Sequence, residues 1–247
     1  MEYIEYVLEY ELEIIKIIDE SVNIKSYFFD KPRDFNFSPG QYCWISVPSK
    51  ITNPAPMAIA SGLEEDFLKF TIRLWGETTE ALFKLKVGEK IIVSEPKGSH
   101  FPLSSIKDKT KLYLIAGGTG ITQIRSLIYS VNKNQCHLYY GAKNQSELLY
   151  NNEFDKWGVQ INTIIQERDS NWKGRYGVVT DLIENNEFNN DDLFFVCGPR
   201  LMEKTVVNLL IQNNINSKSI YISIEKFDSE GNVIGPVLQL FEMGDDF

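Results

Sequence analysis

Three closely spaced glycines stand where an apolar segment passes into a helix-like pattern. In LYLIAGGTGITQIRSLI, residues 112–128, the apolar residues after the glycines recur three and four positions apart. Glycine tolerates positive φ and lets a ligand approach the backbone, while the free N–H groups at a helix start favour a phosphate. The spacing differs from the G-x-G-x-x-G fingerprint, so the turn alone fits a structural role equally well. The candidate cradle residues are Gly117, Gly118, Thr119 and Gly120.

Other residues that could carry chemistry are few and scattered. The 3 cysteines, at positions 43, 136 and 197, lack the paired spacing of zinc or iron–sulfur ligands. The 2 histidines, His100 and His137, cannot form a histidine-rich metal site by themselves. We expect no metal site, and we find no nucleophile paired with a general base. The chemistry must therefore come from a bound cofactor.

The composition argues against several classes of partner. The 247 residues include 25 Lys and Arg against 34 Asp and Glu, a net charge of -9. Nucleic acid and anionic membranes repel such a chain unless it has a basic patch, and no run of basic residues occurs. The opening MEYIEYVLEYELEII lacks a basic signal-peptide segment, and no apolar run approaches the roughly 18 residues of a membrane span. We expect a cytoplasmic protein with no nucleic acid partner and no membrane span.

The first hundred residues are predicted to form mainly short strands. Strand-like segments occur at residues 6–18, 22–30, 37–48, 67–75 and 89–95, separated by turn residues. One predicted helix, TTEALFKLK at residues 78–86, has a threonine N-cap, an acid in its first turn and lysines near its end. Strands punctuated by Gly and Pro, with a single helix, predict a small antiparallel β-barrel.

From about residue 110 the predicted strands alternate with helix-length segments. Strands are predicted at residues 111–118, 136–142, 159–165, 193–199 and 219–227, and helices at 121–131, 145–157, 177–185 and 201–212. This βαβ series predicts a doubly wound parallel sheet that binds ligands at the carboxyl ends of its strands. The boundary lies near residues 104–111, which gives domains of residues 1–105 and 106–247. The tail after Phe227 could add a hairpin around Glu230, Gly231 and Asn232.

Seven short motifs occur in an informative order. They are PGQY (39–42), AIAS (58–61), GETTEAL (76–82), GGTGIT (117–122), YGAKNQSELLY (140–150), CGP (197–199) and IEKF (224–227). On a barrel followed by a βαβ series, this order resembles that of the ferredoxin:NADP reductase superfamily over residues 5–227. The resemblance implies an FAD-binding barrel followed by an NAD(P)-binding domain, with hydride passing between nicotinamide and flavin at their interface. The glycine turn would then hold the NAD(P) pyrophosphate.

The chain departs from the superfamily where the flavin would bind. The usual motif, Arg-x-Tyr/Phe-Ser, supplies a phosphate contact, a ring cover and a group near flavin N5, whereas this chain has Ala55, Met57 and Ala58. Met57 could cover the ring with its polarizable sulfur, and the Ala58 N–H could serve N5. An ordinary apolar barrel strand is the alternative, and a plant and microbial branch of the superfamily has a similar AIAS stretch. The flavin-motif candidates are Met57, Ala58, Ile59, Ala60 and Ser61.

The second flavin element is closer to the superfamily pattern. Gly76, Thr78 and Thr79 open the predicted barrel helix, whose N-H groups and hydroxyls could take the flavin pyrophosphate. A plain N-cap explains Thr78 equally well. In the nucleotide domain, Gln123 stands where the superfamily loop usually continues with Pro, and loss of that stiffening residue bears on affinity.

The resemblance also assigns roles to residues near the C-terminus. Cys197, with Gly198 and Pro199, would lie near nicotinamide C4 as a shaping contact, not as a nucleophile; a small core cysteine is the alternative. Glu225 would orient the carboxamide or a proton path, and Phe227 would pack beside the flavin. An exposed strand acid and a core aromatic are the alternatives for these two residues.

The choice between NAD and NADP stays open in the sequence. Lys143 stands where the superfamily often has an Arg that meets the 2'-phosphate, although Lys offers only a point charge and a solvated Lys is equally compatible. Arg168 and Lys173 could assist, whereas Glu167 would repel the same phosphate. The pattern favours NADP by a small margin.

These features predict a flavin-dependent NAD(P)H oxidoreductase. Reduced nicotinamide would deliver hydride to FAD, and electrons would pass to an acceptor that the sequence does not identify: a small molecule, a quinone or a redox protein. The acidic composition disfavours an acidic ferredoxin. The alternative, motivated by Ala55, Met57 and Ala58, is a non-catalytic nucleotide-binding or interaction subunit that has the fold but no tight flavin.

Overall fold

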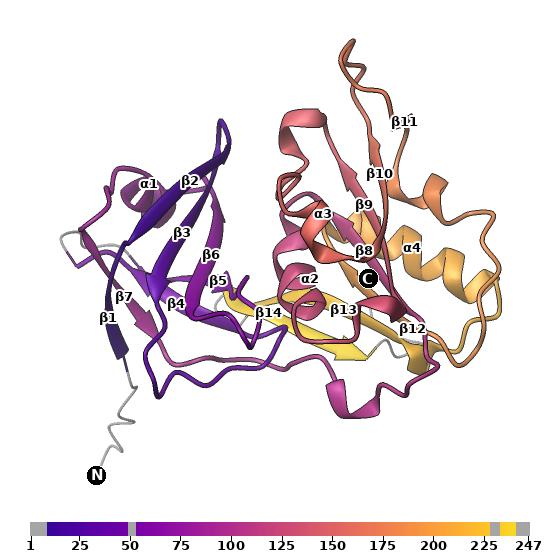
Figure 1. The fold of residues 1–247 in the computed structure, drawn as a ribbon, viewed down its shortest axis with the longest axis horizontal. Coiled ribbons are helices and arrows are strands. Elements are labelled where there is room, and N and C mark those ends of the chain that lie inside the picture. Colours follow the sequence, from indigo (N-terminus) through magenta and orange to yellow (C-terminus); the bar gives the residue numbers. More distant parts are fainter. Residues whose placement is uncertain (1–8, 49–52, 228–232, 241–247) are drawn as a thin grey trace.

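The computed structural model of the chain describes residues 9–48, 53–227 and 233–240, with side chains described as far as residue 223. It has two halves that lie side by side (Figure 1). The N-terminal half holds seven of the strands and one helix, and the C-terminal half holds the remaining strands and helices of the described residues. We refer to them as the barrel half and the α/β half.

The barrel half is antiparallel throughout. Its elements are β1 (Glu9–Glu13), β2 (Lys16–Ser21), β3 (Ile24–Asp30), β4 (Tyr42–Ser46), β5 (Ala55–Ala58), β6 (Phe67–Arg73), α1 (Glu77–Phe83) and β7 (Lys90–Ser94). The strands form two sheets, in the orders β1-β7-β4-β5 and β2-β3-β6. Apolar side chains from both sheets, such as Ile45 and Phe70, share one buried core. The predicted antiparallel barrel with one helix is confirmed.

The start of α1 differs from the prediction. The helix begins at Glu77, and its N-cap is Gly76, whose φ of 79° is a conformation that glycine adopts without strain. Thr78 was predicted to cap the helix, and this is wrong because Thr78 lies within the first turn.

The α/β half contains a seven-stranded sheet. Its elements are β8 (Leu112–Gly117), α2 (Ile121–Ile128), β9 (Cys136–Ala142), α3 (Phe154–Trp157), β10 (Gln160–Ile165), β11 (Arg175–Tyr176), β12 (Leu193–Cys197), α4 (Arg200–Gln212), β13 (Ile220–Phe227) and β14 (Val233–Leu240). The strand order is β11-β10-β9-β8-β12-β13-β14, and every pair is parallel except β13 with β14. The predicted doubly wound parallel sheet is confirmed.

Two predicted helices are shorter than expected. Residues 145–157 contain only a 3-10 turn, Gln145–Glu147, and the single turn of α3, while residues 177–185 contain the 3-10 helix Val179–Leu182. The two long helices cover opposite faces of the sheet: α2 packs Ile124 and Leu127 into one core, and α4 packs Val206 and Leu210 into the other. The central strand β8 between them is buried along its whole length.

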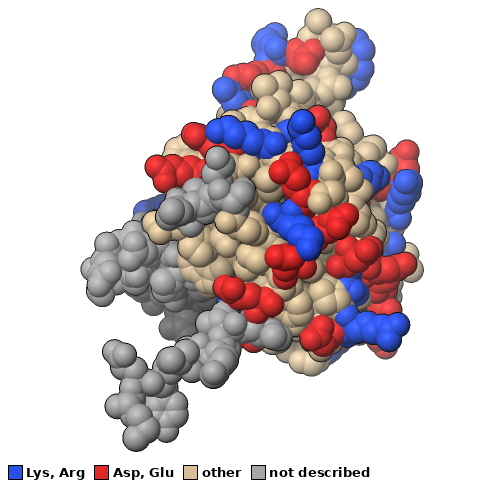
Figure 2. All heavy atoms as spheres, turned by 90° about the vertical axis from the view of Figure 1, so that its left-hand side faces the viewer, with Lys and Arg blue, Asp and Glu red and all other residues tan. Residues whose placement is uncertain are grey.

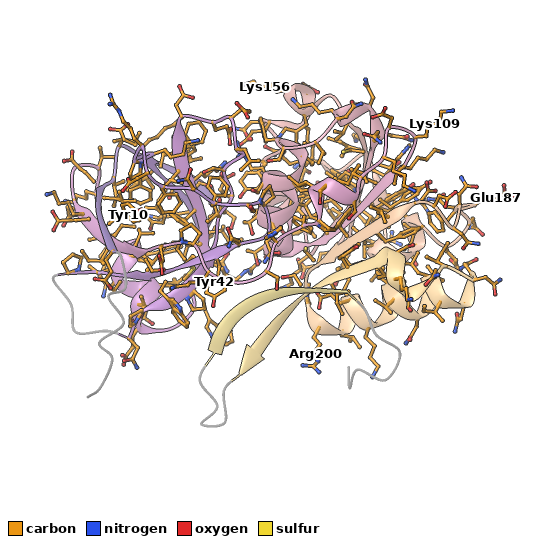
Figure 3. The ribbon with its side chains drawn as sticks, turned by 90° about the horizontal axis from the view of Figure 1, so that it is seen from below. Tyr10, Tyr42, Lys109, Lys156, Glu187 and Arg200 are labelled. Atoms are coloured by element: carbon orange, nitrogen blue, oxygen red, sulfur yellow. The ribbon has the colours of Figure 1, made fainter. Side chains whose placement is uncertain are left out.

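The C-terminal strands form the predicted hairpin, although its turn at residues 228–232 lies outside the described residues. Strand β14 lies beside β5 of the barrel half, and Figure 3 shows the hairpin arching out of the sheet toward the barrel. The chain crosses between the halves after β7 and before β8. The exact domain boundary stays a prediction.

The visible surface carries mixed charge. On the barrel end, Figure 2 shows acidic and basic side chains of the described residues interspersed. Within the described part of the chain, no helix combines the length and the apolar character that crossing a bilayer requires. The same residues contain no group of three or more His, Cys, Asp or Glu side chains arranged to hold a metal ion.

Candidate functional site

The glycine turn lies where β8 ends and α2 begins, at the carboxyl edge of the central strand. A Cβ on Gly120 would lie 2.1 Å from the Cys197 carbonyl oxygen, and a Cβ on Gly117 would lie 2.4 Å from the Met202 sulfur. These two glycines therefore let β8 pack against β12 and α4. Gly118 is different, because its φ is +52° and a Cβ there would meet only the Arg73 guanidinium, at 3.8 Å. Among the described residues, Gly118 is thus the one glycine of the three that has no close neighbour.

Arg73 reaches this turn from the other half of the molecule. It ends β6, its side chain is 33% exposed, and its Nη2 lies 3.0 Å from Glu147 Oε2. The guanidinium therefore lies beside Gly118, where it can contact an anion held by the turn. Arg73 could not be singled out from the sequence, because nothing in the order of residues indicates that a barrel strand contacts the glycine turn.

Arg73 is one of three alternate residues on β6 that contact the α/β half. Thr71 accepts a hydrogen bond of 2.6 Å from the Tyr150 hydroxyl, and Lys69 Nζ lies 2.7 Å from Glu153 Oε1. Because side chains on one face of a strand recur every second residue, positions 69, 71 and 73 form one polar face. That face packs against residues 147–153, so the two halves are joined beside the glycine turn.

Cys197 is fully enclosed at the end of β12. The residue is 1% exposed, and its thiol donates a hydrogen bond to Gln123 Oε1, with 3.7 Å between sulfur and oxygen. Burial raises the pKa of the Cys197 thiol well above its ordinary value, so the thiol is neutral at physiological pH. A neutral, enclosed thiol cannot act as a nucleophile. Gln123, which stands where the superfamily usually has Pro, is the residue that orients this thiol.

Gly198 and Pro199 form a tight crossing next to Cys197. The Gly198 N–H donates a hydrogen bond of 3.2 Å to Glu203 Oε1, and a Cβ on Gly198 would lie 2.6 Å from the Met202 methyl carbon. Pro199 is the N-cap of α4. Gly198 therefore has a packing role, and contact of Gly198 or Pro199 with a cofactor stays a prediction.

The predicted flavin motif divides into an accessible part and a buried part. The β5 residues are partly exposed, with Met57 opposite Cys43 and Ala58 opposite Tyr42 on β4. In contrast, Ile59, Ala60 and Ser61 are at most 1% exposed. The Ala60 and Ser61 carbonyls accept hydrogen bonds from Arg125 and Ser126 of α2.

Flavin contact therefore stays a prediction for all five motif residues. The geometry favours Met57 and Ala58, which are partly exposed, over the three that follow, which are buried.

The start of α1 offers an open backbone. A Cβ on Gly76 would meet no atom of the described residues within 4 Å, and the neighbouring Trp75 is 84% exposed. The Thr78 hydroxyl donates to the Asn53 carbonyl, and the Thr79 hydroxyl donates to the Gly76 carbonyl. Both hydroxyl protons are thus used within the protein, which leaves the backbone N–H groups as the donors of this turn. Trp75 was not singled out from the sequence, although an aromatic residue before the Gly-x-Thr-Thr turn is a usable signal.

The end of β9 carries a charged group. Lys143 Nζ lies 3.3 Å from Glu167 Oε1, and Asn144 Nδ2 donates a hydrogen bond of 3.2 Å to Glu167 Oε2. These contacts with Asn144 and Lys143 lower the pKa of Glu167, so it is ionised at neutral pH. Lys143, which was predicted to meet a 2'-phosphate, is thus paired with Glu167, which follows β10.

Glu225 and Phe227 lie on β13, paired by backbone with Pro236 and Val233 of β14. Their side chains lie outside the described residues, so their predicted roles beside nicotinamide and flavin stay predictions.

An antiparallel barrel followed by a doubly wound sheet, with a glycine turn at the central strand, defines a class of two-domain nucleotide-dependent reductases. Residues 114–208 match the family model described as the oxidoreductase NAD-binding domain. Over 243 residues the chain is 26% identical to sulfhydrogenase 2 subunit gamma of Pyrococcus furiosus, covering 88% of this chain and 83% of that protein. It is 28% identical over 217 residues to the probable dihydroorotate dehydrogenase B (NAD(+)) electron transfer subunit of Methanocaldococcus jannaschii, covering 87% and 77%.

Solved structures have the same fold. The ferredoxin reductase of a carbazole 1,9a-dioxygenase has a TM-score of 0.76 at 21% identity and covers 87% of this chain and 69% of its own. A ferredoxin NADP+ reductase from Neisseria gonorrhoeae, solved with bound FAD and NADP, has a TM-score of 0.73 at 16% identity and covers 92% and 97%. Residues 114–208 therefore match an oxidoreductase NAD-binding domain, and the chain as a whole has the fold of the ferredoxin reductases among these structures.

Proposed function

We propose that this chain is an electron-transfer subunit that takes hydride from NADH and passes electrons through FAD to a partner redox protein. The observation that carries the proposal is the pairing of Gly118 with Arg73. An open, left-handed glycine at the start of α2 and a cation from the barrel half form a cradle to which both halves contribute.

The residues at this cradle fit a dinucleotide pyrophosphate. Backbone N–H groups at the start of α2 can donate to phosphate oxygens, and the helix dipole has the favourable sign. The space beside Gly118 contains no described atom closer than Arg73 to the position of an added Cβ. Arg73 would exchange its Glu147 partner for a phosphate, since a guanidinium binds either anion in the same bidentate manner.

The residues of the barrel half fit FAD in part. The open backbone at Gly76 and the exposed ring of Trp75 suit a pyrophosphate and an adenine, and the partly exposed Met57 suits an isoalloxazine face. Ala55 supplies no charge where the superfamily has an Arg, so we expect weaker FAD binding than the usual motif gives.

Bound FAD would accept a hydride and release electrons singly, and the protein would supply alignment and a dry site. Gln123 holds the neutral Cys197 thiol at the carboxyl end of β12, where the nicotinamide would lie. Cys197 is 1% exposed, so its uncharged sulfur would support that site from behind and would not compete for the hydride. Gly120 lets the start of α2 pack against the Cys197 carbonyl of β12, and Gly117 lets β8 pack against Met202 of α4.

We infer a preference for NADH over NADPH. The strand after the one that carries the glycine turn ends at Ala142, and in dinucleotide-binding folds the residues that follow this strand contact the ribose 2' position. Here Glu167 bonds both Lys143 and Asn144. Its negative charge would repel a 2'-phosphate, and it could accept a hydrogen bond from a 2'-hydroxyl. This reverses the small preference for NADP that the sequence suggested.

The relatives support a redox protein as the acceptor. The two curated relatives described above are subunits of larger redox enzymes, and this chain covers 83% and 77% of their lengths. A small molecule or a quinone would accept electrons by the same reaction scheme. The alternative of a non-catalytic subunit is not favoured, because these relatives are an oxidoreductase subunit and an electron transfer subunit by name.

Absorbance spectroscopy tests the proposal. The purified chain should bind FAD, whose visible absorbance should bleach when NADH is added under anaerobic conditions. Reoxidation by an artificial one-electron acceptor should then restore the flavin spectrum. A folded chain that binds neither FAD nor FMN, or whose bound flavin NADH and NADPH both fail to reduce, would contradict the proposal.

A further inference from the structure

A cluster of charged side chains is buried between the two halves, behind the predicted cofactor site. It consists of Lys69 and Glu65 from the barrel half and Arg125 and Glu153 from the α/β half; we call these four residues the interdomain cluster. The side chains of Lys69 and Arg125 are 0% and 3% exposed, and those of Glu65 and Glu153 are 15% and 16% exposed. Buried charges are costly unless they are paired, so this arrangement needs a reason.

Arg125 makes a complete set of short bonds in this cluster. Its Nη1 and Nη2 lie 2.8 and 2.9 Å from the two oxygens of Glu65, in the fork-to-fork geometry that guanidinium and carboxylate prefer. Its Nε donates to Glu153 Oε2 at 2.8 Å, and Nη1 also donates to the Ala60 carbonyl at 2.7 Å. Because the guanidinium is planar and all these bonds are made at once, its orientation is fixed.

Glu153 joins a second cation to the first. While one of its oxygens accepts from Arg125, the other lies 2.7 Å from Lys69 Nζ, which also sits 4.0 Å from the centre of the Tyr150 ring. Lys69 belongs to β6 and Arg125 to α2, so a single carboxylate binds one cation from each half. Glu20, 3.7 Å from Lys69, adds a further negative charge from β2.

The cluster lies between the two elements that would hold the cofactors. Arg125 is five residues beyond Gly120 on the helix that the glycine turn begins, and Ala60 is two residues beyond Ala58 at the end of β5. Ser126 Oγ donates to the Ser61 carbonyl at 2.6 Å and adds a second bond between the same segments. Because a helix and a strand are stiff over such short distances, these bonds fix the distance from the nucleotide turn to the flavin strand.

We propose that Arg125 is a positioning residue that sets the spacing between nicotinamide and flavin. Its guanidinium would touch neither cofactor, since it is enclosed by Glu65, Glu153 and the backbone of residue 60. Hydride transfer depends steeply on the distance and angle between donor and acceptor, so a fixed separation of the two binding elements favours the reaction. A buried ion network is weak support for stability as such but well suited to holding one arrangement.

Two variants test this role. Arg125→Lys keeps the positive charge but cannot make the bidentate contact with Glu65. Glu65→Gln keeps the size of the side chain but removes the negative charge that the Arg125 guanidinium binds. Where Arg125→Lys fails to fold, Glu65→Gln carries the same test. Arg33→Lys, a change of an exposed arginine on the barrel half, is the matched control.

The first readout needs no cofactor. Spin labels at Val22→Cys and Leu201→Cys, which replace residues that are 100% and 78% exposed on different halves, report the distance between the halves. The 3 native cysteines are buried and should stay unlabelled. We expect the distance distribution to widen in Arg125→Lys and in Glu65→Gln, and to stay unchanged in Arg33→Lys. An unchanged distribution in a folded cluster variant would overturn the proposal.

The second readout rests on the proposed function. In the FAD-loaded protein, we expect the rate of flavin reduction by saturating NADH to fall about 10- to 100-fold in the cluster variants. The dissociation constant of NADH should change less than this rate, because the glycine turn itself is unaltered and only its distance from Arg73 varies. The long-wavelength absorbance of nicotinamide stacked on flavin should weaken in parallel. If no variant and no parent protein binds flavin, the proposed function fails while the distance measurement still decides the role of Arg125.

Discussion

The Arg73 guanidinium lies 3.8 Å from the position that a Cβ on Gly118 would occupy. The two residues are 45 positions apart and belong to different halves, β6 of the barrel and the turn between β8 and α2. Gly118 provides space and backbone donors, and Arg73 provides charge. An anion held there would contact both halves at once, so nucleotide binding and the arrangement of the halves are linked.

Gly118→Val should selectively weaken binding of the nicotinamide nucleotide. Its methyl groups would fill the space beside Arg73, and a side chain at a φ of +52° is also strained by about 1–2 kcal/mol. Any bound flavin should remain. Titration of NADH against the folded variant and the parent measures this effect. Unchanged affinity would remove the turn from the site.

The effect of backbone strain alone is controlled by comparing two alanine variants, Gly118→Ala and Gly88→Ala. Gly88 also has a positive φ, +90°, and an added Cβ there would meet nothing within 4 Å. Both alanine variants should lose similar stability, whereas only Gly118→Ala should lose nucleotide affinity.

Arg73→Gln should weaken nucleotide binding by about one to two decades, the amount expected for loss of one charge-assisted contact to phosphate. The dissociation constant should also depend less on salt concentration, because the contact between the Arg73 charge and the phosphate is removed. Isothermal titration at two ionic strengths measures both quantities. Arg33→Gln, at an exposed position on the barrel half, should change neither.

The order of elements could be read from the sequence because each element is specified locally. Alternating segments such as FLKFTIRLW indicated strands, and the change to helix-length spacing near residue 110 indicated the second half. Residues 145–157 were predicted as one helix because their apolar residues suit helical spacing. In the structure the apolar side chains pack into the core of the α/β half from irregular backbone. Polar groups of the same segment bond to the barrel strand β6, as the Tyr150 hydroxyl does to Thr71. Contact with another half overrides local preference.

The candidate site was only partly readable for the same reason. A glycine turn is visible in a sequence, but the sequence does not distinguish Gly118, which is open, from Gly120, which packs against the Cys197 carbonyl. Arg73 and Arg125 were missed because their partners are distant in the chain. A polar face at positions 69, 71 and 73 of a predicted strand was the available signal.

Acid should weaken the contact between the halves through Glu153. Burial alone would raise the pKa of this carboxyl, but Arg125 and Lys69 outweigh burial and hold the pKa below its ordinary value of 4.5. A carboxyl with a lowered pKa in the folded state stabilises that state above the ordinary pKa. This contribution is lost as the pH falls through the folded-state value.

The free energy of unfolding should therefore fall as the pH drops below about 4.5, and Glu153→Gln should make that slope shallower. Denaturant unfolding at several pH values measures the slope. Asp155→Asn, which changes a neighbouring acid on α3, is the control. A Glu153→Gln slope equal to that of the parent would show that this carboxylate does not link protonation to folding.

Glu167→Gln should shift cofactor preference toward NADPH. The change removes the charge that pairs with Lys143, 3.3 Å away, so the lysine becomes free to meet a 2'-phosphate. We expect the ratio of the NADPH to the NADH dissociation constant to fall by several-fold, about the size of one exposed charge contact. Glu184→Gln, at an exposed acid of the same half, should leave the ratio unchanged. An unchanged ratio in Glu167→Gln would exclude this acid from nucleotide selection.

Ala55→Arg should tighten FAD binding if the flavin adopts the superfamily pose. Ala55 begins β5 opposite Ile45 and is partly exposed, so a longer side chain can extend from the strand without entering the barrel core. A new arginine would add a charge-assisted contact to the flavin phosphates, worth at most about one to two decades in affinity.

Ala55→Gln is the matched control, since it adds a polar side chain without the charge. The FAD dissociation constants of parent and both variants should be compared at low and high salt, because a phosphate contact weakens as salt screens it. Tighter, salt-dependent binding in Ala55→Arg alone would place the flavin phosphates beside this residue. If Ala55→Arg melts like the parent and binds FAD no more tightly, the flavin phosphates lie elsewhere, and the alignment of residues 55–61 with the usual flavin motif is wrong. The glycine turn and the fold would be unaffected by that outcome, because they rest on β8, α2 and the sheet order.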